Sequence, residues 1–123
     1  VINGDGTFSR DFTYIDNVIQ INKLALFTKN KEALNEVYNV AYGESSTLNE
    51  LYEEIKSNLS QYDSNLSSIK SVHGPNRKGD IPHSLASIEK AQRLLDYNPL
   101  FSLKSGLEAT MKWYWDHKSS LEV

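Results

Sequence analysis

The sequence predicts one mixed α/β unit, built from four helices and two or three short strands. Its 123 residues are enough for one domain or part of one, and too few for two. Strand-forming residues at positions 37–41 precede a helix that begins with a capping box, because Thr47 and Glu50 have the spacing of that motif. A strand followed by a short loop and a capped helix is typical of an α/β layer.

The first third of the chain alternates extended segments with a helix. Ile2 is expected to end a short strand, and the glycines and Asx residues at positions 3–6 favour a tight turn with positive φ. Aromatic and β-branched residues at positions 12–15 predict a second extended segment. Asp16 is the expected cap of a helix that ends near positions 28–30. After this helix, the run at 37–41 is the best candidate for a buried strand.

The second half is predicted to be helical with polar connections. The serine-rich segment 57–71 is too polar to bury much, so we expect a helix end and a mobile loop there. Ser87 is the expected cap of a third helix, which Tyr97-Asn98-Pro99 stops. Ser102 opens a last helix that carries the aromatic residues of positions 113–115.

Composition excludes several classes of function. The chain has 13 basic and 16 acidic residues, which argues against a protein that binds the phosphate backbone of nucleic acid. There is no cysteine, so disulfides, thiolate metal sites and cysteine nucleophiles are excluded. His73, His83 and His117 lack the mutual spacing of metal ligands. No apolar run could span a bilayer, and no leader sequence is visible, so we expect a soluble, cytoplasmic protein.

Two of the three arginines have positions that suit a phosphate site. Arg10 and Arg77 lie in loops beside a glycine turn and an acidic residue, whereas Arg93 lies inside a helical pattern. A guanidinium group binds phosphate oxygens with two parallel hydrogen bonds, which lysine cannot do. The alternative is that each arginine pairs with a surface carboxylate, and spacing alone does not separate the two interpretations.

Five segments together give the chain a family resemblance. In order, they are Gly4-Asp5-Gly6, the stretch at 10–17, Tyr38-Asn39-Val40, Arg77-Lys78-Gly79-Asp80 and the stretch at 88–91. In this order and spacing they resemble the C-terminal part of extended short-chain dehydrogenase/reductases, and within them the NAD-dependent nucleotide-sugar 4-epimerases. The segment 79–86 is similar to bacterial epimerases that interconvert UDP-N-acetylglucosamine and UDP-N-acetylgalactosamine.

The resemblance implies a set of substrate-binding residues. Arg10 and Arg77 would hold the pyrophosphate of the UDP-sugar, Asp80 would accept hydrogen bonds from the ribose hydroxyls, Ser84 would line the sugar pocket, and Ile2 and Asn3 would lie beside the uracil. These roles agree with the chemistry of the side chains, because a guanidinium group donates hydrogen bonds to phosphate oxygens and a carboxylate accepts them from the hydroxyls of a diol. The small side chain of Ser84 favours N-acetylated hexosamines, unless it is an ordinary polar loop residue.

The resemblance also implies that the catalytic machinery lies outside residues 1–123. The family binds NAD through a Gly-x-x-Gly-x-x-Gly loop in an N-terminal Rossmann domain, and this chain has no such loop. Tyr52 with Lys56 and Tyr114 with Lys118 match the Tyr-x-x-x-Lys spacing of the catalytic pair, but the family's pair lies upstream of every segment present here. We therefore expect the UDP-sugar-binding domain of a larger enzyme, a homodimer when complete, and no activity from this chain alone.

Other functions stay open at this point. A nucleotide-sugar dehydratase or a UDP-uronate epimerase would share the same arginines and aspartate. A different class is a non-catalytic interaction module, in which the arginines are surface residues and Trp113, Tyr114 and Trp115 form a protein-docking patch.

Overall fold

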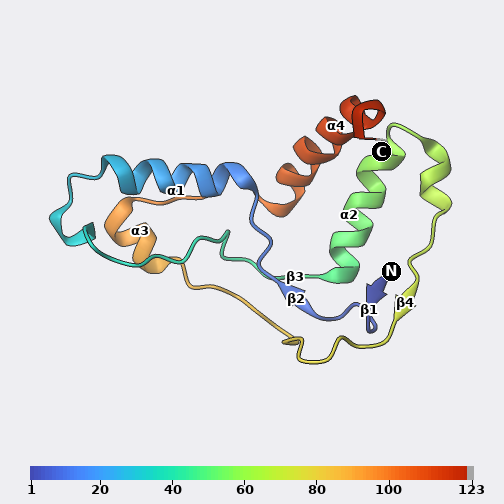
Figure 1. Cartoon of the computed structure of the whole chain (residues 1–123), viewed down its shortest axis with the longest axis horizontal. Coiled ribbons are helices and arrows are strands. Elements are labelled where there is room, and N and C mark those ends of the chain that lie inside the picture. The colour runs from blue at the N-terminus through green and yellow to red at the C-terminus, as the bar shows by residue number, and fades with distance from the viewer. Residues whose placement is uncertain (122–123) are drawn as a thin grey trace.

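The computed structural model describes residues 1–121 and consists of two helix pairs joined by long extended segments (Figure 1). In one pair, α1 (Ile15–Phe27) packs against α3 (Glu89–Leu95). In the other, α2 (Leu48–Ser60) packs against α4 (Leu103–Leu121). Two short 3₁₀ helices, η1 (Lys31–Ala33) and η2 (Ser64–Ser68), follow α1 and α2. The predicted four helices are confirmed, and the architecture is that of a mixed α/β unit.

Four strands of two residues each tie distant segments together. β1 (Ile2–Asn3) pairs in parallel with β4 (His73–Gly74), and β2 (Ser9–Arg10) pairs antiparallel with β3 (Ser46–Thr47). A further parallel bridge joins Ser9 to His83. The segment 72–84 therefore runs beside the first ten residues and is fastened to them at both ends.

The hydrophobic core lies around the pair α1 and α3. Its buried members are Ile21, Ala33, Ala41, Ile88, Ala91, Leu94, Leu95 and Tyr97. The Asn17 side chain, also buried, accepts hydrogen bonds from the backbone N–H groups of Leu100 and Phe101, each at 3.0 Å, and donates to the Phe101 carbonyl at 2.7 Å. Asn17 thereby fixes the segment before α4 to the first helix.

Local motifs formed as the sequence predicted. The Thr47 hydroxyl accepts from the Glu50 backbone N–H at 3.1 Å, and the Glu50 carboxylate accepts from the Thr47 N–H at 2.7 Å, which completes the capping box. Gly4 and Gly6 have φ angles of +73° and +80°, as the expected turn requires. Both motifs depend only on residues close together in the sequence.

The predicted strand at 37–41 is wrong. This segment belongs to no strand among the residues described, and Ala41 lies in a bend; Val37 is 85% exposed and only Ala41 is buried. Its last residues are held by side chains instead of a strand partner, since the Tyr97 hydroxyl donates to the Ala41 carbonyl at 2.9 Å. A strand needs a neighbouring strand to hydrogen-bond with, and strand propensity alone does not provide one.

Several predicted boundaries also moved. Asp16 is not the cap of the first helix, because Tyr14 occupies that position and Asp16 lies in the first turn. The strand character expected at 12–15 forms no strand among the residues described, since β2 ends at Arg10 and Ile15 already opens α1. Ser87 does not cap α3, whose N-cap is Ile88. In the serine-rich segment, α2 continues to Ser60 and is followed by η2.

The described chain exposes more surface than a compact protein of its mass. Its accessible area is 8746 Å², against about 6,700 Å² expected for a compact monomer of 14.0 kDa. Large apolar side chains contribute to the excess, among them Ile15, Leu26 and Phe27 on α1. Among the helices described, none combines the length and apolar content needed to cross a bilayer.

Candidate functional site

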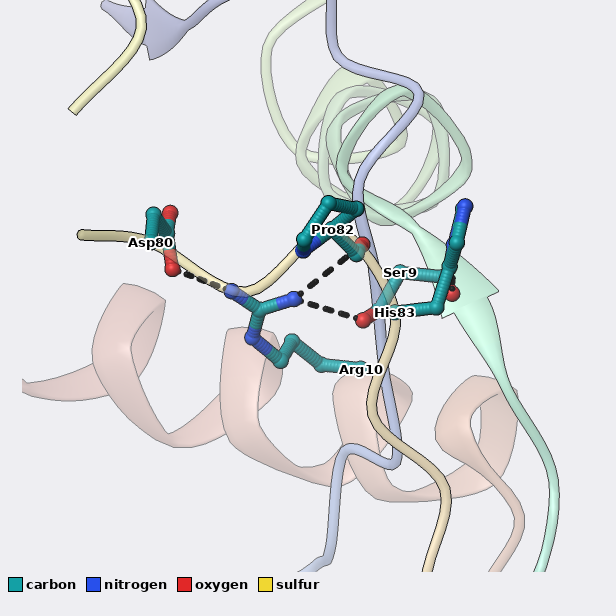
Figure 2. A network of polar contacts seen from close by, with 5 residues as sticks. All are labelled: Ser9, Arg10, Asp80, Pro82 and His83. Atoms are coloured by element: carbon teal, nitrogen blue, oxygen red, sulfur yellow. Dashed lines mark hydrogen bonds and ion pairs between the residues drawn. The ribbon is translucent and has the colours of Figure 1, made fainter. Parts of the chain in front are cut away.

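The site is organised around the Arg10 side chain, which lies at the end of β2 (Figure 2). Its Nη1 donates to the Ser9 carbonyl at 2.7 Å and faces the Pro82 carbonyl at 3.4 Å. Its Nη2 donates to the Asp80 carboxylate and forms an ion pair with it. The two charged side chains are 28% and 27% exposed, so water reaches both. The guanidinium group is thus held in one orientation with its edge toward Asp80.

A glycine turn delivers Asp80 to Arg10. The Asp80 backbone N–H donates to the Arg77 carbonyl at 3.1 Å, which closes a four-residue turn. Gly79, the third residue of this turn, has a φ angle of +81°, a conformation that favours glycine. Because the turn joins Arg77 to Asp80, the backbones of all three predicted phosphate and ribose residues lie in one region of the molecule.

The loop after this turn is fastened to β2. The Ser9 N–H donates to the Pro82 carbonyl at 2.9 Å, and the Ser84 N–H donates to the Ser9 carbonyl at 3.1 Å. The Ser9 hydroxyl and His83 Nδ1 are 2.9 Å apart, within hydrogen-bond distance. His83 therefore braces this loop, and Ser84 is positioned one residue from Arg10 across the bridge.

The remaining predicted residues lie at the other end of the same paired segments. Ile2 and Asn3 pair with His73 and Gly74, and the turn that begins at Arg77 follows β4 after two residues. The structure thus places all six predicted residues on the segments 2–10 and 72–84. It joins Arg10 to Asp80 directly, whereas the Arg77 side chain is exposed. Their roles toward a ligand stay predictions.

Asp11 has a structural role that no motif in the sequence indicates. Its two carboxylate oxygens accept from the backbone N–H groups of Tyr42 and Gly43, each at 3.0 Å. Gly43 has a φ angle of +90° there, so its conformation favours glycine. The Asp11 carboxylate thereby ties the segment after residue 41 to β2, next to Arg10. Its partners lie about thirty residues away, beyond the reach of a local motif.

Replacing Asp11 by alanine is expected to lower the free energy of unfolding by about 1–3 kcal/mol, because two backbone donors lose a charged acceptor. Thermal or urea denaturation measures the loss. Asp11→Asn keeps one acceptor oxygen, so its free energy of unfolding should lie between those of the wild type and Asp11→Ala. Asp16→Ala is the matched control, since Asp16 is exposed and caps no helix. Equal stability of Asp11→Ala and the control would contradict this role.

The residues of the two Tyr-x-x-x-Lys spacings make contacts within and between nearby segments of the chain. The Tyr52 hydroxyl donates to the Ile69 carbonyl at 2.8 Å, and Lys56 pairs with Glu53. Lys118 lies over the Trp115 ring, 3.7 Å from its centroid. Lys56 also lies over the Tyr52 ring, 5.2 Å from its centroid, and among the residues described no hydrogen bond joins either tyrosine hydroxyl to its lysine. Within residues 1–121, no cluster of three His, Asp or Glu side chains could hold a metal ion.

Trp115 and its neighbours differ in what they contact. Trp115 stacks on Tyr62 with ring centroids 5.2 Å apart, and so packs α4 against the end of α2. Trp113 and Tyr114 are about half exposed and contact each other edge to face. The patch that an interaction module would use is therefore reduced to Trp113 and Tyr114.

Comparison with known proteins gives a consistent group of relatives. No protein-family model matches the chain. It is 29% identical over 113 residues to a putative UDP-glucose 4-epimerase of Methanocaldococcus jannaschii, covering 92% of this chain and 33% of that protein. It is 30% identical over 124 residues to UDP-glucuronate 4-epimerase 4 of Arabidopsis thaliana, covering 93% of this chain and 27% of that protein. The chain thus spans between about a quarter and a third of the length of these relatives.

Solved structures extend the match to the fold. A UDP-glucose 4-epimerase of Thermotoga maritima, determined with UDP-glucose, matches with a TM-score of 0.78 and 32% identity, covering 98% of this chain and 36% of that one. A UDP-N-acetylglucosamine 4-epimerase of Methanobrevibacter ruminantium, in complex with UDP-N-acetylmuramic acid, matches with a TM-score of 0.80 and 34% identity over 94% of this chain and 34% of that one. A UDP-glucuronic acid 4-epimerase of Bacillus cereus, with UDP-glucuronic acid and NAD, matches with a TM-score of 0.73 and 35% identity over the same shares.

Proposed function

We propose that this chain forms the UDP-sugar-binding portion of an NAD-dependent 4-epimerase. The premise is that its sequence and fold match the C-terminal part of nucleotide-sugar epimerases, which are extended short-chain dehydrogenase/reductases. In this proposal the chain binds and orients the nucleotide sugar. The residues that would hold it are the six that lie on the paired segments 2–10 and 72–84.

The observation that supports this proposal best is the meeting of Arg10 and Asp80 across 70 positions of sequence. The guanidinium fork matches two phosphate oxygens, and the carboxylate can accept two hydrogen bonds from a vicinal diol. Arg77, in the same turn as Asp80, would supply the second positive charge for a diphosphate. Phosphate and ribose are adjacent in a nucleotide, as these side chains are in the protein.

For the sugar, we propose an N-acetylated hexosamine. Ser84 is a small residue positioned beside Arg10 by its bond to the Ser9 carbonyl, and a small side chain leaves room for a 2-acetamido group. UDP-glucuronate is the second candidate, because the Arabidopsis relative at 30% identity is named as a UDP-glucuronate 4-epimerase. Product analysis with both UDP-sugars distinguishes them, since only one should be turned over efficiently by the complete enzyme.

We place the cofactor chemistry outside this chain. Its sequence has no glycine-rich loop at a helix N-terminus that could receive the pyrophosphate of NAD, so its residues do not fit a nicotinamide site. The area of 8746 Å² and the apolar side chains on α1 are what a docking surface for the NAD-binding domain would provide. The chain alone is accordingly proposed to be inactive, and the complete enzyme to form a homodimer.

Calorimetric titration with UDP, on the complete polypeptide that includes these residues, tests the proposal. We expect saturable binding that Arg77→Ala weakens by about tenfold or more, as loss of a charged hydrogen bond predicts. Arg93→Ala is the matched control, because it removes the same group from α3, away from the paired segments, and should leave the affinity unchanged. A folded protein that shows no binding at millimolar UDP would rule out the proposal.

A further inference from the structure

We infer that Asp80 makes the phosphate-binding edge of Arg10 selective for nucleoside diphosphates over free phosphates, an inference that rests on the proposed function. The basis is the direct ion pair between the two side chains that the proposal assigns to different parts of one ligand. An anion that takes the Arg10 guanidinium competes with Asp80 for it. Only a ligand that also carries a diol gives Asp80 new partners.

The hydrogen bonds of Arg10 define which edge is contested. Nη1 is directed at the Ser9 and Pro82 carbonyls, which belong to the backbone and are fixed by the bridge between their segments. Nη2 is directed at the Asp80 carboxylate. A phosphate oxygen that approaches the Nη2 edge therefore meets a carboxylate of the same sign and has to displace it.

Displacement has different consequences for different ligands. The Asp80 side chain is only 27% exposed, so losing the guanidinium leaves a partly desolvated carboxylate without its cation. Free pyrophosphate brings no pair of hydroxyl donors that could compensate. The 2′- and 3′-hydroxyls of a ribose bring two O–H donors, and a carboxylate has room for both. The ion pair therefore weakens the binding of a free anion more than that of a nucleoside diphosphate.

The turn around Asp80 allows this exchange to occur locally. The backbone of Asp80 is held by its bond to the Arg77 carbonyl, so the carboxylate can turn from Arg10 to a diol by side-chain rotation alone. At Gly79, the third residue of the same turn, no heavy atom beyond its two chain neighbours lies within 4 Å of where a Cβ would be, and the turn therefore has open space beside it.

The test compares three ligands on the complete polypeptide: UDP, inorganic pyrophosphate and 2′,3′-dideoxy-UDP. In Asp80→Asn we expect pyrophosphate to bind about tenfold more tightly than in the wild type, because the competing charge is gone. The same variant should lose most of its preference for UDP over dideoxy-UDP. The matched control is Asp116→Asn, which also removes one paired carboxylate, the partner of Lys112 on α4, and should change neither quantity.

The outcomes separate this inference from the proposed function. If the wild type binds UDP but Asp80→Asn binds pyrophosphate no more tightly than the wild type does, the inference is overturned and the proposed function stays intact. Equal tightening of all three ligands would also overturn it, since that is the effect of net charge alone. Failure of the folded wild type to bind UDP would remove both. Asp80→Ser, checked for folding by thermal denaturation, replaces Asp80→Asn if that variant does not fold.

Discussion

Replacement of Arg10 by alanine is expected to weaken UDP binding by about a hundredfold. The substitution removes the guanidinium fork from the proposed phosphate site and leaves the Asp80 carboxylate without its ion-pair partner, beside the incoming diphosphate. A charged hydrogen bond contributes about 1.5–3 kcal/mol, and each 1.4 kcal/mol is a factor of ten in affinity. Calorimetric titration with UDP measures the change.

Arg10→Lys separates the effect of charge from that of shape. Lysine keeps the positive charge but lacks the planar guanidinium group. It therefore cannot donate to the Ser9 and Pro82 carbonyls and to Asp80 at the same time in the geometry of Arg10. Its affinity should lie between those of the wild type and Arg10→Ala. Lys112→Ala, which breaks an exposed ion pair on α4, is the control and should bind UDP normally. Wild-type affinity in Arg10→Ala would place the diphosphate elsewhere.

The largest effect on stability is expected at Tyr97. This side chain is 1% exposed in the core between α1 and α3, so Tyr97→Ala should lower the free energy of unfolding by about 3–5 kcal/mol. Tyr97→Phe keeps the ring but leaves the Ala41 carbonyl without its donor, at a cost of about 1–2 kcal/mol. Urea denaturation of both variants separates packing from the hydrogen bond.

The pH dependence of stability gives an independent check on Tyr97. Burial, assisted by the nearby Asp11 charge, raises the pKa of the Tyr97 phenol above its ordinary value of 10.0. The neutral form is therefore favoured in the folded state, and its contribution is fully present below pH 10 and lost as the pH rises through the folded pKa. Tyr97→Phe should lack this alkaline loss. An identical loss in the variant would assign it to other groups.

Features that depend on neighbouring residues could be predicted from the sequence. The capping box of Thr47 and Glu50 and the glycine turn at positions 3–6 both need only four consecutive residues, and both formed. The group of relatives was also identifiable, because the motifs around Arg10 and Asp80 occur in a characteristic order. The strand at 37–41 was not predictable, because a strand needs a partner that propensity does not specify.

By itself, the sequence determined which residue types are available to a diphosphate and a diol, and in which turns they lie. Only the tertiary structure decided that Arg10 faces Asp80, that Asp11 holds Tyr42 and Gly43, and that Tyr97 closes the core on Ala41. Each of these contacts joins positions 31 to 70 residues apart. Such pairs form through the packing of whole segments, and no local preference of either residue encodes them.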